Sequence, residues 1–304
     1  MTRRARDLQG SRLPVRDRRD LCPGVLRPWP ADDGGLVRIR LVGGRVRPAA
    51  LVALGEVAAE HGDGELHLTT RANLQLRGLP LHDGRLPAQV LAAVEATGLL
   101  PSRTHELARN VLVSPLTGVA GGRADLRPVA AELDARLCAS PALASLPGRF
   151  LFVLDDGRGD LVDLQGLVRR GPDLGLVALD ATTAQLRHGR EGWGDVVPLT
   201  DAAAALVHLA ERFTRLRGTE ASAPWHVDEL AAPLAARRPR DPRTRVREEP
   251  IDRGTASGPG WTHLAVPDGT LSPRLLAELD PSGPDLVVTP WHGIVIPRST
   301  REHD

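Results

Sequence analysis

Apolar and polar residues alternate over residues 37–42, where Arg38 and Arg40 separate the apolar positions. This period of two predicts a half-buried strand, which the Gly43-Gly44 pair ends. The next stretch begins with Pro48, a residue suited to a first helical turn, and stops at Gly62. Its apolar positions fall on one helical face: Leu51, Leu54, Val57 and Ala58. A second alternating stretch, residues 66–76, predicts another strand and completes a strand-helix-strand unit.

This unit occurs twice in the chain. Residues 66–76 align without a gap with residues 286–296, threonine on threonine, and residues 41–48 match residues 266–273 upstream of them. Such an internal repeat is typical of a duplicated supersecondary unit. One unit alone leaves strand edges unpaired and an apolar face open. The repeat therefore predicts that the two copies pair into a single sheet with helices on one side.

The segment between the copies has another pattern, which predicts a mixed α/β domain. The expected helices are 91–99, 129–137 and 201–216, and the expected strands are 110–113, 150–154, 174–179 and a short apolar run at 161–164. The predicted organisation is α+β: a mobile leader at 1–20, a first half-domain at 21–88, a central domain at 89–234, a linker at 235–260 and a second half-domain at 261–300.

Composition limits the classes of function. The 39 basic and 38 acidic side chains nearly cancel, so no global charge attracts nucleic acid or a membrane surface. No apolar run approaches the roughly 18 residues of a membrane span, and the arginine-rich N-terminus has no apolar signal core. We expect a cytoplasmic protein. Its two cysteines, Cys22 and Cys138, predict no disulfide framework, and the scattered histidines predict no metal site.

Four arginines lie within or beside apolar stretches: Arg71, Arg77, Arg109 and Arg149. A guanidinium next to a buried strand is costly unless an anion or a carboxylate meets it. For any one of them, the ordinary interpretation is a strand end at the surface, paired with an aspartate or glutamate. That interpretation is favoured for Arg77, which follows the last apolar position of its strand.

The segments around these arginines resemble the nitrite and sulfite reductase family. The resemblance rests on these stretches, in this order: Cys22-Pro23-Gly24-Val25-Leu26, Leu68-Thr69-Thr70-Arg71-Ala72-Asn73-Leu74-Gln75, Ala108-Arg109-Asn110-Val111-Leu112, Leu146-Pro147-Gly148-Arg149-Phe150 and Thr289-Pro290-Trp291. The first and the last look most like the precorrin-3B synthase branch of aerobic cobalamin biosynthesis. Two positions depart from the family, because Leu151 and His292 stand where relatives carry basic residues.

The resemblance implies ferredoxin-like half-domains packed with α/β domains that bind a 4Fe-4S cluster and sirohaem. It also implies that Arg71, Arg109 and Arg149 face a bound anion, since planar guanidinium groups bind the carboxylates of a tetrapyrrole or a small oxyanion. Asn73, Gln75 and Asn110 are expected to add hydrogen bonds. No residue is assigned a catalytic role.

Family members carry their cluster ligands as a Cys-x5-Cys and a Cys-x3-Cys pair after the second half-domain, and this sequence ends at Asp304 without them. A 4Fe-4S cluster needs four thiolates, so the chain alone is not expected to hold one. Three functions stay open. The first is a truncated oxidoreductase whose cluster domain comes from a separate chain, the second a non-catalytic protein that binds a tetrapyrrole or a partner, and the third an inactive remnant.

Overall fold

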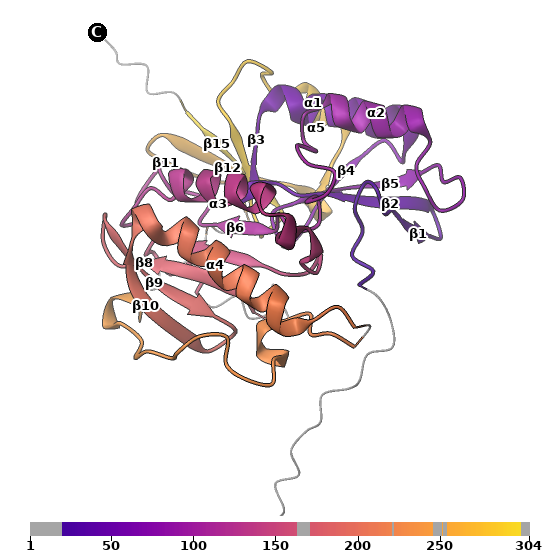
Figure 1. Ribbon diagram of the computed structural model, residues 1–304. Helices are drawn as coiled ribbons and strands as arrows, with labels where there is room; N and C mark the ends of the chain where they lie inside the picture. The colour runs from indigo at the N-terminus through magenta and orange to yellow at the C-terminus, as the bar shows by residue number, and fades with distance from the viewer. Residues whose placement is uncertain (1–19, 163–170, 221, 246–250, 252–253, 299–304) are drawn as a thin grey trace, which may run out of the picture.

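The computed structural model describes residues 20–162, 171–220, 222–245, 251 and 254–298 (Figure 1). Within them it forms three five-stranded sheets, two in the half-domains and one in the central unit. The mixed α+β class is confirmed. The leader predicted at 1–20 lies outside the described residues except for Asp20. Of the short strand predicted at 161–164, residues 161–162 form a turn and the other two lie outside the described residues.

The first half-domain has the sheet order β1-β2-β5-β4-β13. Its own elements are β1 (Trp29–Ala31), β2 (Gly34–Ile39), α1 (Pro48–His61), β4 (Leu66–Leu68), β5 (Leu74–Leu79) and α2 (Ala88–Ala96). The helices α1 and α2 cover one face of this sheet (Figure 1). The predicted apolar face of α1 is buried against alternate strand residues such as Val37 and Ile39. Val90 and Val94 of α2 belong to the same core, so the half-domain extends past the expected boundary at residue 88.

The second half-domain repeats this plan with the sheet order β11-β12-β15-β14-β3. Its own elements are β11 (Ala256–Gly258), β12 (Trp261–Ala265), α5 (Pro273–Ala277), β14 (Leu286–Val288) and β15 (Gly293–Pro297). The side chain of Ser272 accepts a hydrogen bond from the Leu275 N–H and so caps α5. Since β11 lies inside the segment expected to be a linker, the half-domain begins before residue 261.

The two half-domains exchange short strands, which corrects the expectation of one continuous sheet. β3 (Arg45–Val46) comes from the first copy but pairs with β14 of the second, and β13 (Thr270–Leu271) comes from the second but pairs with β4 of the first. Each exchanged strand follows a one-turn 3-10 helix, η1 (Val42–Gly44) or η5 (Pro267–Gly269). Both turns contain residues with positive φ at matching positions, which direct the chain into the other sheet.

The alternating stretch at 66–76 is a hairpin and not a single strand. β4 ends at Leu68, a turn follows, and β5 begins at Leu74. The Thr69 Oγ1 accepts a hydrogen bond from the Asn73 N–H at 3.1 Å, and Ala72 has φ +54°. The second copy builds the same turn, in which His292 has φ +58°. The repeat in the sequence is therefore a repeat of backbone conformation, and Arg71 lies in the turn.

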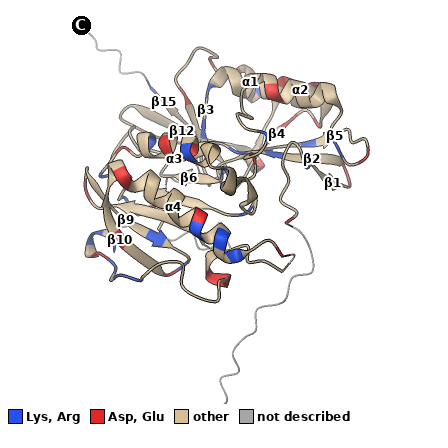
Figure 2. Ribbon diagram, in the orientation of Figure 1, with Lys and Arg blue, Asp and Glu red and all other residues tan. Residues whose placement is uncertain are grey.

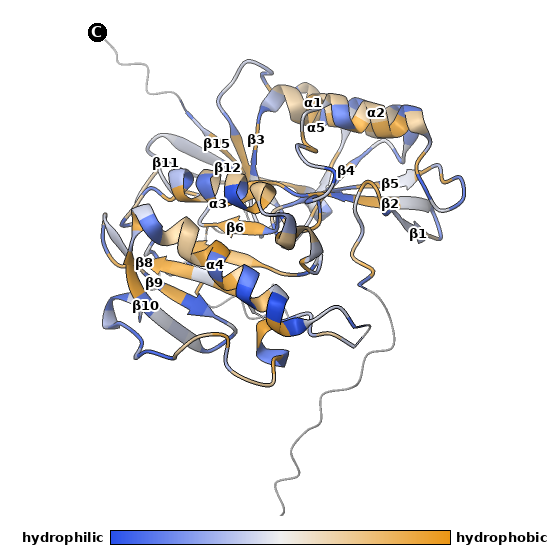
Figure 3. Ribbon diagram, in the orientation of Figure 1, coloured by the Kyte–Doolittle hydropathy of each residue, from blue (hydrophilic) through white to orange (hydrophobic). Residues whose placement is uncertain are grey.

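The central unit contains β6 (Val111–Val113), α3 (Arg127–Ala139), η2 (Pro141–Ser145), β7 (Phe152–Asp155), β8 (Leu174–Ala178), β9 (Thr183–His188), β10 (Gly192–Pro198) and α4 (Leu199–Arg217). The sheet order is β10-β9-β8-β7-β6, with β6, β7 and β8 parallel. Helices α3 and α4 cover one face (Figure 1), where the Phe150 ring meets the rings of Phe152 and Phe213. Alternate residues such as Val153 face the half-domains, so the parallel strands of this sheet are buried on both faces, and β6 and β8 are largely hydrophobic in Figure 3.

The first described part of the predicted linker, residues 235–245, packs against the central sheet. The Arg238 N–H donates to the Trp193 carbonyl at 2.7 Å, and the Asp241 N–H donates to the Gln185 side chain at 2.9 Å. A short helix, η4 (Pro242–Arg245), continues this segment, and another, η3 (Val227–Glu229), precedes it. Because polar backbone contacts and not an apolar pattern hold the segment, its packing left no signal in the hydrophobic periodicity.

Candidate functional site

The face of the first half-domain sheet that α1 and α2 leave uncovered is basic. Along β2, Val37 and Ile39 point to the core, so Arg38 and the adjoining Arg40 point to the opposite face. Gln75 of β5 is the cross-strand neighbour of Arg38, and the Arg38 Nη2 donates to its Oε1 at 3.4 Å. Figure 2 shows these strands among the basic parts of the half-domain.

Four guanidinium groups meet on this face, from Arg38, Arg40, Arg71 and Arg149, and we call them the arginine cluster. The Arg71 Nη1 donates to the Arg149 carbonyl at 3.0 Å, which joins the turn of the half-domain to the loop before β7. Burial, together with the neighbouring positive charges of Arg38 and Arg71, lowers the pKa of Arg40 to about 10. Burial also lowers the pKa of Arg71, and Arg38 and Arg149 add to that effect.

The described residues neutralise this cluster poorly. The Nε atoms of Arg38, Arg40 and Arg149 are buried and have no hydrogen-bond partner among the described residues. Asp20 reaches the Arg149 Nε only at 3.8 Å. Unpaired buried guanidinium atoms cost free energy, so the cluster has the charge and the open donors of a site for an anion.

Glu106 and Cys22 are two other acidic groups near the cluster. Glu106 accepts the N–H groups of Val25 and Leu26, and burial raises the pKa of its carboxyl. Cys22 lies beside the guanidinium groups, and burial followed by the charge of Asp20 raises the pKa of its thiol. The thiol is therefore protonated at neutral pH.

The two predicted asparagines, Asn73 and Asn110, form buried hydrogen bonds that connect the segments of the site. The Asn73 Nδ2 donates to the Asn110 Oδ1 at 3.2 Å, and the Asn110 Nδ2 donates to the Gly148 carbonyl at 2.7 Å. The Arg40 Nη2 donates to that same carbonyl at 3.2 Å. Both asparagines are about 1% exposed, so they position the loops and do not reach a ligand. They connect β2, the turn after β4, the start of β6 and the loop before β7.

Arg109 stands apart from the cluster. Its Nε and Nη2 donate to the two carboxylate oxygens of Asp134 on α3, at 2.6 and 2.9 Å. This bidentate pair satisfies the guanidinium locally and gives Arg109 a partner other than the predicted anion, so its role at an anion stays a prediction. Arg77 behaves as the ordinary interpretation expects, since its Nε donates to Asp33 at 2.8 Å.

Of the six predicted site residues, Arg71, Arg149 and Gln75 reach the basic face. Arg149 also lies over the Trp225 ring, with its Cζ atom 4.6 Å from the centroid. The sequence interpretation missed Arg38 and Arg40. Their alternation with apolar residues was visible, but alternation alone also describes a solvent-exposed face, and only the turn of Arg71 and the loop of Arg149 convert that face into a cluster.

The described residues offer no metal centre. No group of three or more histidine, cysteine or acidic side chains lies in metal-binding reach among them. Both cysteines are free thiols, and Cys138 lies beside Asp134 on α3, away from the arginine cluster. Two thiols do not fit a 4Fe-4S cluster, so no chemistry through such a cluster follows from this chain. Within the same residues, no helix has both the length and the apolar character needed to cross a bilayer.

Comparison with known proteins gives matches to parts of longer proteins. Residues 30–84 match the nitrite/sulfite reductase ferredoxin-like half domain. Precorrin-3B synthase of Sinorhizobium sp is 33% identical over 144 residues, which are 46% of this chain and 29% of that protein. Ferredoxin–nitrite reductase of Synechococcus elongatus is 30% identical over 134 residues, which are 42% of this chain and 26% of that protein.

A solved structure has the same fold. The Mycobacterium tuberculosis NirA protein superposes with a TM-score of 0.58 over 88% of this chain and 56% of that chain, at 17% identity. The chain thus spans little more than half of that structure and less than a third of each curated relative. The matched half-domain is the one that carries Arg38, Arg40 and Arg71. One half-domain of the chain thus matches the nitrite/sulfite reductase ferredoxin-like half domain, and the fold is shared with a solved structure over most of the chain.

Proposed function

We propose that the arginine cluster binds the carboxylates of an anionic tetrapyrrole and that the chain is a precorrin-3B synthase-like protein of cobalamin biosynthesis. The observation that carries the proposal is the set of buried Nε atoms on Arg38, Arg40 and Arg149 without partners among the described residues. A ligand carboxylate meets this need because it accepts two N–H bonds from one guanidinium.

Several separated guanidinium groups favour a ligand with several acidic groups. Arg38 and Arg40 project from β2, Arg71 from the turn after β4 and Arg149 from the loop before β7. A small oxyanion such as sulfite contacts one or two guanidinium groups, whereas a tetrapyrrole with several peripheral carboxylates contacts all four. Sirohaem fits this donor set, and its ring would supply redox chemistry at a bound iron, while the chain's own residues hold the carboxylates and fix their orientation.

Catalysis is a second step that this chain does not carry out with a cluster of its own. Its two cysteines are two fewer than a 4Fe-4S cluster requires. Chemistry at a 4Fe-4S cluster would therefore need thiolates from outside these 304 residues. Tetrapyrrole binding is the function that these residues support by themselves.

Absorption titration of the full chain with sirohaem tests the proposal. We expect saturable binding that Arg71→Met and Arg38→Met each weaken about tenfold or more, because each loses charge-assisted hydrogen bonds. Arg77→Met is the matched control: it removes an arginine of the same sheet that already pairs with Asp33, and binding should not change.

Two results would overturn the assignment. Sulfite that competes with sirohaem at equal concentration would favour a small-oxyanion site. Absence of saturable binding, in a chain whose unfolding is cooperative, would favour an inactive remnant.

A further inference from the structure

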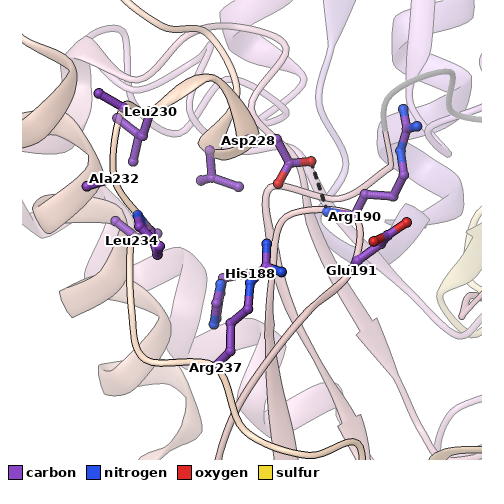
Figure 4. Close-up of a pocket in the computed structure, with 11 residues that line it drawn as sticks. His188, Arg190, Glu191, Asp228, Leu230, Ala232, Leu234 and Arg237 are labelled. Atoms are coloured by element: carbon purple, nitrogen blue, oxygen red, sulfur yellow. Dashed lines mark hydrogen bonds between the residues drawn. The ribbon is translucent and has the colours of Figure 1, made fainter. Parts of the chain in front are cut away.

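A second site lies in the central unit, away from the arginine cluster. A cavity of about 460 Å³ opens between the β9–β10 turn and the segment that follows Val227 (Figure 4). Its volume falls in the range of about 300–1,000 Å³ that is usual for small-molecule sites. None of the residues that line it belongs to the arginine cluster.

The cavity has three chemically different sides (Figure 4). Leu230, Ala232 and Leu234 form an apolar wall on one side. Asp228 and Glu191 lie on the opposite side, with Arg190 beside them, and His188 and Arg237 lie beside each other at one end. The two carboxylates thus lie apart from both Arg237 and the apolar wall within one small volume.

The charges at the two polar sides are open to a ligand. Arg237 and Glu191 are exposed and form no ion pair with any described residue, and so they do not neutralise each other. Asp228 accepts the Arg190 N–H at 3.1 Å, which fixes the carboxylate at the cavity edge. Its side chain remains 45% exposed.

His188 gives the cavity a buried polar atom. Its residue is 6% exposed, and its Nε2 has no hydrogen-bond partner among the described residues. Burial lowers the pKa of the imidazole; the Ala236 carbonyl opposes this effect, and the charge of Arg237 adds to it. The ring is therefore neutral at neutral pH, when it is able to exchange one hydrogen bond with a ligand.

We propose that this cavity binds a small zwitterion, an α-amino acid with an apolar side chain. Its carboxylate lies at the end formed by Arg237 and His188, and its ammonium lies near Asp228 and Glu191. Its side chain packs on the apolar wall. A simple anion would face two carboxylates and a simple cation would face Arg237, so a ligand with both charges matches the site best.

Calorimetric titration of the full chain with L-leucine tests this proposal. We expect saturable binding, with 4-methylpentanoate and 3-methylbutylamine at least about tenfold weaker, because each lacks one of the two charges. Glycine, which lacks the apolar side chain, should also bind more weakly. Arg237→Gln and Glu191→Gln should each weaken leucine binding about tenfold.

Arg245→Gln is the matched control, because Arg245 is an exposed arginine of the following segment and does not line the cavity. Failure of leucine to bind, equal binding of 4-methylpentanoate, or equal losses in the Arg237 and Arg245 variants would each overturn the proposal. These outcomes are independent of sirohaem binding, since the two sites share no residue.

Discussion

The Arg109–Asp134 pair provides the sharpest test of the structure against the family resemblance. The resemblance places Arg109 at the anion, whereas the structure places it in a bidentate ion pair on α3. The side chains of Arg109 and Asp134 are 9% and 23% exposed. Removal of one partner from a buried pair costs about 3–5 kcal/mol, and the partial exposure of Asp134 favours the lower end.

Three variants measure how much each partner of the Arg109–Asp134 pair contributes to the free energy of unfolding. Arg109→Met should lower the free energy of unfolding by about 3 kcal/mol, because it leaves the Asp134 carboxylate without its donor. Asp134→Leu should lower the free energy of unfolding by at least as much, because it leaves the Arg109 guanidinium unpaired, and this group is the more buried of the two. The free energy of unfolding of the double variant should lie within about 1 kcal/mol of that of the natural chain, since both charges are removed together.

Urea unfolding followed by the fluorescence of the five tryptophans measures these changes. Sirohaem titration at low temperature, where each variant is folded, provides the second readout. We expect Arg109→Met to bind like the natural chain. If this variant keeps its stability but loses the ligand, then Arg109 faces the anion and the geometry described above is wrong.

Two further predictions concern stability alone. Burial raises the pKa of Asp160 well above the ordinary value of 3.8. The variant Asp160→Asn should therefore raise the Tm at pH 8 by about 2–4 °C, and this gain should vanish as the pH falls towards 3.8. Hydrogen bonds lower the pKa of Asp180, so Asp180→Asn should instead lower the Tm at pH 8. Calorimetry at several pH values would contradict this if both variants shifted in the same direction. In urea unfolding, Gly44→Ala should lower the free energy of unfolding by about 2 kcal/mol more than Gly64→Ala does. Both glycines have positive φ, but a Cβ at Gly44 would clash with the Val288 carbonyl, whereas Gly64 faces open space. Equal costs would refute that reasoning.

The sequence predicted the parts of the fold that periodicity controls. The apolar face of α1 and the long amphipathic helix α4 (Leu199–Arg217) lie where the pattern indicated. The exchange of β3 and β13 was not visible, because a two-residue strand has no period and its partner is set by a turn. β9 and β10 were also missed, because their polar and glycine residues interrupt the apolar pattern; in the structure β9 forms a hairpin with β8, and β10 forms one with β9.

The candidate site was half predictable for a related reason. Residue type and position in a motif indicated Arg71 and Arg149, but the same reasoning included Arg109, which forms a close bidentate pair with Asp134. That contact depends on how α3 packs against the start of β6. Arg38 and Arg40 were visible as the polar half of an alternating strand, and only the approach of two loops distinguishes them from solvent-facing residues.

The second half-domain shows that the arginine cluster is not required by the fold. In the repeat, the positions of Arg38, Arg40 and Arg71 correspond to His263, Ala265 and Trp291. There, His263 Nδ1 bonds to the Gly254 carbonyl at 3.0 Å, and Trp291 is buried in the shared core.

The same turns and strand order therefore form without any guanidinium. A fold that forms without these charges gains nothing from burying several of them side by side, because each costs free energy by desolvation. Their presence in one copy supports our proposal that an anion binds there and offsets this cost.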